Sequence, residues 1–412
     1  EVFRAALVRR PDKDWQWHQN VWRLDFSEFK KPGLYRIAVP GLGESVPVRI
    51  HDGADAVSPR LLALGLYNQR SGADKGTPFT RFGHRASHTA PAEIPDGSER
   101  FKKTDRHVGA MARKNSGEQA APVMESVEAS LYPIVRKGTV GVSGGHYDAG
   151  DYSKYAINSA QVIHCLVFAV DHFPGVDRID NLGIPESGDG VPDALQIAAR
   201  EARFVLKMQD DDGGFFFLVY PRDRAYELDV LPENGDPQVV FPKNTGATAA
   251  CVGALAQIAA SPALKKSDPA LAARCLDAAK RGYDFLKRAI AEHGFDGSYQ
   301  AISHYGNYSG HRDELCFAAA GMFAATGDKA FERDLMSWWP DPLDGRDRKW
   351  GWFPLYEAYG SAARVYAFAE APGFLPAGSA DPAYLEKMRA ALRNAADTWL
   401  KLSDANAYGL PF

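Results

Sequence analysis

The sequence predicts a mainly α fold, an (α/α)6 toroid that is incomplete at its C-terminal end and preceded by part of an immunoglobulin-like β-sandwich. Up to about Asp52, apolar and polar residues alternate as they do in strands. From about Ser58 the apolar residues recur with a helical period. No strand pattern alternates with the helical stretches, which disfavours a doubly wound α/β fold. We expect a partial β domain over 1–52 and a helical domain over 53–412 whose C-terminal part is missing.

The N-terminal domain is expected to consist of short strands. An apolar, β-rich stretch, VFRAALV, is followed by NVWRLDFSEF, whose side chains alternate between two sides. KPGLYRIAV places a Pro-Gly turn before a strand, and SVPVRI is a short last strand. About four strands are too few for an immunoglobulin-like domain, which needs about seven, so the segment matches the second half of such a sandwich.

The helical domain is expected to begin at Ser58, because Ser-Pro supplies an N-cap followed by a first-turn proline. The stretch from Phe79 to Gly141 is polar and rich in Gly, Pro and charge, which predicts a long surface loop. Helices are predicted at Tyr152–Phe173, after Pro192, and at Thr245–Ala260, Pro269–His293, Arg312–Thr326, Pro354–Ala369 and Pro382–Lys401. About eight or nine helices fall short of the roughly twelve in a six-hairpin toroid.

Composition narrows the class of protein. A net charge of −4 gives no sign of a nucleic-acid partner, and no apolar run reaches the ~18 residues of a membrane span. The chain opens on Glu1, which fits a processed, trimmed or partial chain. We expect a monomer. The cysteines are expected to be buried free thiols, and they are Cys165, Cys251, Cys275 and Cys316.

The stretch GGHYDAGDYSKYA places Asp148 and Asp151 three residues apart in a glycine-rich setting. A structural interpretation makes Asp151 the N-cap of a helix that starts at Tyr152, and Asp148 the first residue of an Asx-turn before Gly150. Spacing alone favours this interpretation, because a lone pair of aspartates is a weak signal.

A catalytic interpretation of the same stretch is also physical. Backbone N–H groups and the helix dipole at a helix N-terminus stabilise an ionised carboxylate, which is the form that a general base needs. Two such carboxylates can hold one water. An inverting glycosidase uses that arrangement on one face of the sugar, with a protonated acid ~6.5–9.5 Å away across the bond.

The wider stretch SGGHYDAGDYSKYAINSA closely resembles the signature of glycoside hydrolase family 9, whose members are inverting β-glucanases with an (α/α)6 toroid. Five further stretches resemble the family in the same order: LYNQRSG, FTRFGHRASH, GVPDALQIAAREARFVLKMQ, NTGATAACVGALAQIA and RDELCFAAAGMFAATGD. LDFSEF and PGLYRI are similar to the immunoglobulin-like module that precedes the toroid in one branch. The resemblance covers nearly the whole chain and identifies the helical domain as catalytic.

The resemblance assigns roles residue by residue. Asp151 matches the general base, and Asp148 matches the second aspartate, which positions the water. Substrate contacts are expected from Tyr147, His146, Tyr155 and Trp352, although packing is the commoner role of the two tyrosines.

The chain also departs from the family pattern. His146 stands where the family usually has Trp, and Ser87-His88 replaces the Cys-His of members with zinc, so we expect no zinc. No Asn-Glu pair is present, and no glutamate follows Glu386, so the general acid of the family is not found. We expect either a fragment or a partner polypeptide that supplies the acid.

The resemblance requires no cofactor but allows structural calcium. Asp210, Asp211 and Asp212 precede two glycines, and the stretch from Glu186 to Asp193 is a second acidic loop. Neither has EF-hand spacing, and a solvated acidic turn is the alternative for the first.

The implied function is hydrolysis of β-1,4-glucosidic bonds in cellulose or related β-glucans with inversion, of the endoglucanase or cellulase type, in a secreted or periplasmic protein. Two alternatives stay open. One is an exo-acting glycosidase on oligosaccharides or glucosamine-type substrates, to which His146 and the long loop before Gly141 would contribute by narrowing the cleft. The other is a non-catalytic glycan-binding protein that lacks the general acid.

Overall fold

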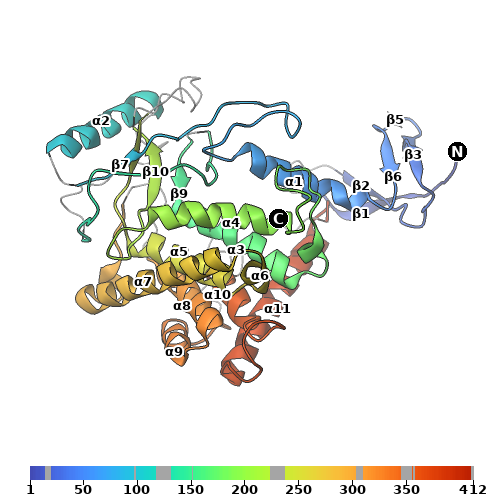
Figure 1. Cartoon of the computed structure of the whole chain (residues 1–412). Coiled ribbons are helices and arrows are strands. Elements are labelled where there is room, and N and C mark those ends of the chain that lie inside the picture. Colours follow the sequence, from blue (N-terminus) through green and yellow to red (C-terminus); the bar gives the residue numbers. More distant parts are fainter. Residues whose placement is uncertain are drawn as a thin grey trace. The chain divides into compact units, whose positions relative to one another are not determined.

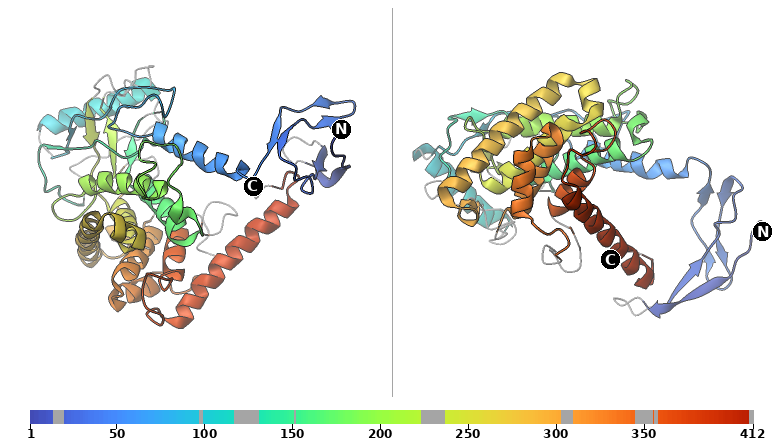
Figure 2. Two further views of the ribbon diagram at one scale, coloured as in Figure 1. Left: turned by 45° about the vertical axis from the view of Figure 1, so that its right-hand side comes forward. Right: turned by 90° about the horizontal axis from the view of Figure 1, so that it is seen from below.

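The computed structural model describes residues 1–13, 20–96, 99–116, 131–150, 152–222, 237–302, 310–344, 355 and 358–409. They fall into two compact units. One unit combines residues 1–62 with 393–412, and the other comprises residues 63–392. The boundary between residues 52 and 53 stays a prediction. Figures 1 and 2 show the elements in chain order from blue to red.

The N-terminal unit is rich in short strands. β1 pairs with β2, β3 with β6 and β4 with β5, each pair antiparallel. Its described strands are β1 Leu7–Lys13, β2 Asn20–Leu24, β3 Gly33–Tyr35, β4 Ala38–Val39, β5 Gly43–Glu44 and β6 Val48–Ile50. The predicted β-rich N-terminal region is confirmed, with two more short strands than expected. Its immunoglobulin-like character stays a prediction.

The larger unit is built from helix pairs. α3 packs on α5, α5 on α8 and α8 on α10, while α4, α7 and α9 pack on the outside of α3, α5 and α8 respectively. The described helices of the chain, of which α1 begins and α11 ends in the other unit, are α1 Val57–Asn68, α2 Glu99–Ser116, α3 Ala156–His172, α4 Asp193–Val205, α5 Thr245–Ala260, α6 Pro262–Ser267, α7 Pro269–His293, α8 Arg312–Thr326, α9 Lys329–Trp338, α10 Ala358–Ala367 and α11 Pro382–Ala405. An inner row of helices covered by an outer row is α/α toroid architecture, so the predicted helical fold is confirmed.

Burial explains which helices are inner. All 16 residues of α5 are buried, and its small side chains allow close approach. A Cβ at Gly253 would lie 2.5 Å from the ring of Phe317 on α8. The outer helix α7 instead buries only one face. The predicted bounds of α5, α7 and α8 match the structure, because strong caps mark them. The Asn244 side chain accepts from the Ala247 N–H, and Asp268 accepts from the Leu271 N–H before Pro269.

The helix predicted from Tyr152 begins later. α3 starts at Ala156 with Tyr155 as its N-cap, and the strand β9 Lys154–Tyr155 precedes it. The prediction that Asp151 caps this helix is therefore wrong, and the dipole argument built on that cap no longer applies. β9 forms because Lys154 and Tyr155 pair with Val219 and Leu218 of the strand β10.

The stretch from Phe79 to Gly141, predicted as a loop, contains the 18-residue helix α2 and the strands β7 Ala92–Glu93 and β8 Thr139–Val140. A five-stranded sheet with the order β8-β7-β11-β10-β9 includes them, with β10 Leu218–Pro221 and β11 Gln238–Val240. Strands of two to four residues are too short to show a period of two. Because β9 runs directly into α3 and β11 leads into α5, the sheet lies at the N-terminal ends of inner helices (Figure 1).

All four cysteines are free thiols, but the burial prediction fails for Cys165, which is exposed. Cys165 lies one turn after Gln161 on α3, and both side chains are exposed. The other three are buried, and burial raises the pKa of Cys275 to about 12. Within the described residues, none of the helices combines the length and apolar character needed to cross a bilayer.

Candidate active site

The aspartate loop, which we define as Val142–Asp148, is held along one side by the chain that follows α1. The Ser71 N–H donates to the Gly145 carbonyl at 3.0 Å, and the Tyr147 N–H donates to the Gln69 carbonyl at 2.8 Å. These two bonds flank an isolated bridge between Arg70 and His146. The backbone of the loop is therefore fixed immediately before Asp148.

Two glycines permit this close fit. Gly145 has φ +74°, and a Cβ there would lie 2.6 Å from Cδ1 of Phe204 on α4. Gly72 has φ +78°, and a Cβ there would lie 2.6 Å from the backbone nitrogen of Gly144. Both backbone conformations are strained for other residues, and neither position has space for a side chain. The glycine-rich composition of this stretch is thus a packing requirement of the loop.

The two aromatic residues of the loop point inward. His146 is 7% exposed, and its Nδ1 is hydrogen-bonded to Oε2 of Glu201, which is fully buried on α4. Tyr147 is 5% exposed, and its hydroxyl is hydrogen-bonded to Oγ of Ser87. This geometry is that of residues that brace the loop. The substrate contacts expected of both side chains stay predictions.

Asp148 points the other way. Its side chain is exposed, and Oδ1 accepts a hydrogen bond of 2.5 Å from Nδ2 of Asn158 in the first turn of α3. Its backbone N–H donates to the Ser153 carbonyl at 2.8 Å, which turns the chain back toward β9. A solvent-accessible carboxylate held by an amide donor is suited to bind a water or a polar ligand. Tyr155 is buried in β9 with its ring against Phe217, so its expected substrate contact also stays a prediction.

Lys154 reaches beneath the aspartate loop. It is fully buried, and its ammonium donates to the carbonyl of Val142, to the carbonyl of Gly144 at 3.1 Å and to Oγ of Ser71 at 3.2 Å. Burial lowers the pKa of Lys154 to about 7, although the charge of Glu201 acts in the opposite direction. The ammonium also lies 4.5 Å from the centre of the Phe204 ring.

His88 is the second residue of the Ser87-His88 pair, which replaces the Cys-His of family members with zinc. It is 5% exposed and packs edge-on against the Tyr147 ring at 5.3 Å. Burial, with a contribution from the charge of Lys154, lowers the pKa of His88 to about 2, so the ring is neutral. Among the residues described, no group of three or more His, Cys, Asp or Glu side chains is placed to hold a metal ion. The expectation about zinc stays a prediction.

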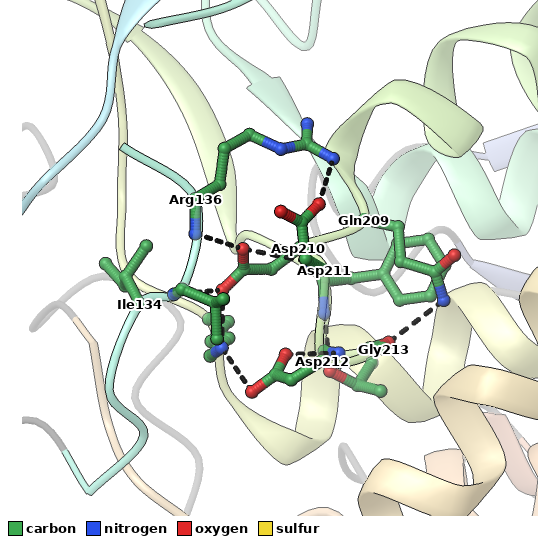
Figure 3. Close-up of polar contacts among 12 residues, drawn as sticks. Ile134, Arg136, Gln209, Asp210, Asp211, Asp212 and Gly213 are labelled. Atoms are coloured by element: carbon green, nitrogen blue, oxygen red, sulfur yellow. Dashed lines mark hydrogen bonds and ion pairs between the residues drawn. The ribbon is translucent and has the colours of Figure 1, made fainter. Parts of the chain in front are cut away.

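The first candidate calcium loop, Asp210–Asp212, is drawn in Figure 3 together with Arg136 and Gly213. The fully buried Lys243 donates to Oδ2 of Asp210 at 2.5 Å and to Oδ2 of Asp212 at 2.6 Å. Burial raises the pKa of Asp210, but the Lys243 hydrogen bond and two backbone donors outweigh burial, and the pKa is lowered. The ammonium thus supplies the positive charge between these carboxylates, and a calcium ion there would have to displace it.

The same turn fastens the segment before the aspartate loop. The backbone N–H groups of Val135 and Arg136 donate to the two oxygens of Asp210, each at 2.9 Å. The Arg136 guanidinium pairs with Asp211 at 3.1 Å near the surface. The alternative of a solvated acidic turn therefore holds for Asp211 only.

The second candidate calcium loop also uses its carboxylates internally. Glu186 accepts both of its bonds from Nη1 of the buried Arg70, at 2.7 and 2.9 Å. Oδ2 of Asp193 accepts from the Leu182 N–H at 2.6 Å and from the Ser187 hydroxyl. Calcium at either loop stays a prediction.

The catalytic pair is described only in part. Asp151 and Trp352 lie outside the described residues, so of the predicted site residues the structure describes Tyr147, His146, Tyr155 and Asp148. Three residues of this site were not singled out from the sequence: Asn158, Lys154 and Glu201. Glu201 could be found from the sequence, because a charged residue on the apolar face of α4, between Ala198 and Val205, indicates a buried polar role.

Comparison with known proteins gives the class and then the family. The described fold matches a thermostable endoglucanase from Alicyclobacillus acidocaldarius with a TM-score of 0.69 and 23% identity, over 95% of this chain and 64% of that one. This likeness shows the fold, an α/α toroid preceded by a β-rich region. The sequence profile described as Glycosyl hydrolase family 9 matches residues 62–409. The chain therefore belongs to glycoside hydrolase family 9.

Two curated relatives extend over nearly the whole chain. Endoglucanase D of Acetivibrio thermocellus is 26% identical over 99% of this chain. A cellulose 1,4-beta-cellobiosidase of the same organism is 27% identical over 97% of this chain. The chain spans 58% of the length of the first relative and 45% of the second.

Proposed function

We propose that this protein hydrolyses β-1,4-glucosidic bonds in cellulose or related β-glucans with inversion at the anomeric carbon. Family membership over residues 62–409 supports this function. The observation that carries it at the site is the aspartate loop, where Asp148 alone of the three residues 146–148 turns its side chain outward.

In the proposed reaction, Asp151 takes a proton from a water, and Asp148 holds that water in line with the anomeric carbon. The oxygen–carbon bond forms on one face while the bond to the leaving oxygen breaks on the other. Asn158 donates to Oδ1 of Asp148 and so orients the carboxylate that is to accept a hydrogen bond from the water. The leaving oxygen takes its proton from a general acid on the opposite side of the bond, and the proposal assigns that acid to a glutamate outside this sequence.

The test is hydrolysis of cellohexaose and of a soluble β-1,4-glucan by the wild type and by Asp151→Ala. We expect the substitution to lower the rate by about a hundredfold or more, because the water loses its base. Proton NMR of the first products should show the α-anomer. Hydrolysis that survives Asp151→Ala, or a β-anomer as the first product, would contradict the proposal.

Asp211→Asn is the matched control. It removes an exposed carboxylate from another acidic loop of the same unit, whose only described ion pair is with Arg136. We expect unchanged rates, with unchanged circular dichroism in both variants. A non-catalytic glycan-binding protein would instead bind soluble glucan without turnover, and its binding would survive Asp151→Ala.

Exo-action is a second candidate because one relative carries the name cellobiosidase. The products from cellohexaose separate the two modes. Mixed fragment lengths early in the reaction support endo-action, whereas release of one short product from a chain end supports exo-action. Faster cleavage of chito-oligosaccharides would indicate a glucosamine-type substrate. We further propose that the protein is secreted or periplasmic, because polymeric β-glucans lie outside the cytoplasm. The expected monomer stays a prediction.

A further inference from the structure

We propose that Lys154 is a positioning residue that closes the segment bearing both aspartates and holds it where the reaction needs it. This inference rests on the proposed function. Lys154 has no place in the water-activation chemistry, and its side chain is 0% exposed. It therefore acts through the loop rather than on substrate.

The contacts of Lys154 account for every donor of its ammonium. An ammonium has three N–H groups, and the three acceptors are the carbonyls of Val142 and Gly144 and the hydroxyl of Ser71. Two of these acceptors belong to the aspartate loop itself. The third belongs to the chain that already pairs with the loop through its backbone.

The position of Lys154 in the chain gives these contacts their consequence. Lys154 and Gly144 are ten residues apart, and Asp148 lies between them. The ammonium thus ties the residue that follows the aspartates to the residues that precede them. A clamp at both ends limits the conformations of the segment between, which is how a carboxylate is kept within the small tolerance that catalysis allows.

Burial of this charge has a cost that apolar packing would not have. In the described part of the chain, the bonds of Lys154 go to carbonyls and a hydroxyl, and no carboxylate is bonded to it. The charged groups that act on it are Glu201 and Arg200 on α4 and Lys207 two residues after α4, and the neutral ring of His88 also feels its charge. A methionine, whose unbranched side chain is one atom shorter than that of lysine, would fill most of the same space without desolvating a charge. The three hydrogen bonds that the ammonium donates are therefore what a lysine supplies at this position and an apolar side chain does not.

The experiment compares Lys154→Met with Lys207→Met in the purified protein. Lys207 also donates to the aspartate loop, at 2.7 Å to the Ser143 carbonyl, but from the exposed side. On cellohexaose we expect Lys154→Met to lower kcat by about tenfold or more with KM within about twofold, and Lys207→Met to lower kcat by less than about threefold. A folded Lys154→Met that keeps kcat within about twofold overturns the proposal.

Hydrogen exchange gives a readout that does not depend on turnover. Lys154→Met should lose protection at residues 142–148 and at 69–72, while α5 and α8 stay protected. If the wild type hydrolyses none of the glucans, the proposed function fails. The clamp is then supported by this loss of protection and overturned by unchanged protection.

Ser71→Ala covers the case in which Lys154→Met does not fold. It removes one acceptor of the ammonium and keeps the backbone bond to Gly145. We expect kcat to fall by about twofold to fivefold with KM unchanged and with partial loss of protection at residues 142–148. Unchanged kcat together with unchanged protection overturns the proposal.

Discussion

The aspartate loop and the Asp210–Asp212 turn look alike in sequence and differ in what they do with charge. Each places aspartates beside glycines, and each has a lysine with 0% exposure behind it. In the turn, Lys243 binds the carboxylates of Asp210 and Asp212 directly. In the loop, Lys154 binds backbone carbonyls, and the carboxylate of Asp148 is exposed beside an amide.

The difference shows that the target of the buried ammonium, rather than the acidic pattern, separates a structural loop from a chemical one. Where the ammonium neutralises the carboxylates, they are fixed as internal ligands and anchor the neighbouring backbone. Where the ammonium holds the backbone, the carboxylate of Asp148 keeps its access to solvent. Three substitutions test this contrast, and they follow in order of expected effect.

Lys243→Met should have the largest effect. The substitution leaves Asp210, which is fully buried, and Asp212 without their shared cation. Removing one partner of a buried ion pair costs about 3–5 kcal/mol, because the remaining charge stays desolvated. Urea unfolding at neutral pH, followed by circular dichroism, measures the loss in the free energy of unfolding.

The double variant Asp210→Asn with Lys243→Met is the control for that measurement. It removes the uncompensated charge together with the ammonium, so we expect it to recover a large part of the lost stability. A loss below about 1 kcal/mol in the single variant would mean that the carboxylates of the turn do not depend on Lys243.

Lys154 should give the second largest effect, as a dependence of stability on pH. The pKa of Lys154 falls from its ordinary 10.5 to about 7 in the folded protein. Between these values the unfolded chain binds a proton that the folded chain does not, so the free energy of unfolding rises with pH. The slope for one proton is about 1.4 kcal/mol per pH unit. Lys154→Met lacks this contribution.

The measurement is the difference in unfolding free energy between wild type and Lys154→Met at about pH 7.5 and about pH 9.5. Taking the difference cancels the other groups that titrate in this range. We expect it to shift in favour of the wild type by about 2–3 kcal/mol across the interval. A difference that is independent of pH would show that the ammonium stays charged throughout, and the contrast with Lys243 would then rest on geometry alone.

The sequence predicted the helical architecture well where local signals were strong. The bounds of α5, α7 and α8 follow from Asn244, Asp268 and a left-handed Gly327, which are local stop and start signals. The start of α3 could not be predicted, because the strand pairing of Lys154 and Tyr155 with β10 overrides the helical pattern. The pairing partner lies more than sixty residues away in the chain, beyond the reach of any local pattern.

For the site too, the sequence predicts the local features and misses the contacts between distant residues. The motif located Asp148 and the glycines that its loop requires. It could not locate Asn158 or Glu201 as partners of Asp148 and His146, because those contacts come from two different helices brought together by the fold. The acidic turn looks like a calcium candidate in the sequence, because Lys243 lies thirty-one residues after Asp212 and joins the turn only in the folded chain.

Asn158→Ala should have the smallest effect and tests the exposed side of the aspartate loop. The substitution removes the 2.5 Å hydrogen bond to Oδ1 of Asp148 without disturbing the buried clamp. An exposed hydrogen bond to a charged group contributes about 1 kcal/mol, so under the proposed function we expect kcat to fall by about fivefold, with KM and the melting temperature unchanged.

Asn158→Asp is the companion variant, because it keeps the size of the side chain and places a second negative charge beside Asp148. Repulsion raises the pKa of the pair, so activity should be lost further at low pH and partly recovered as pH rises. Steady-state rates on cellohexaose between about pH 4 and about pH 8 decide the matter. Identical kcat and pH profiles in all three proteins would mean that Asn158 does not orient Asp148, and that the aspartate loop is positioned from its buried side alone.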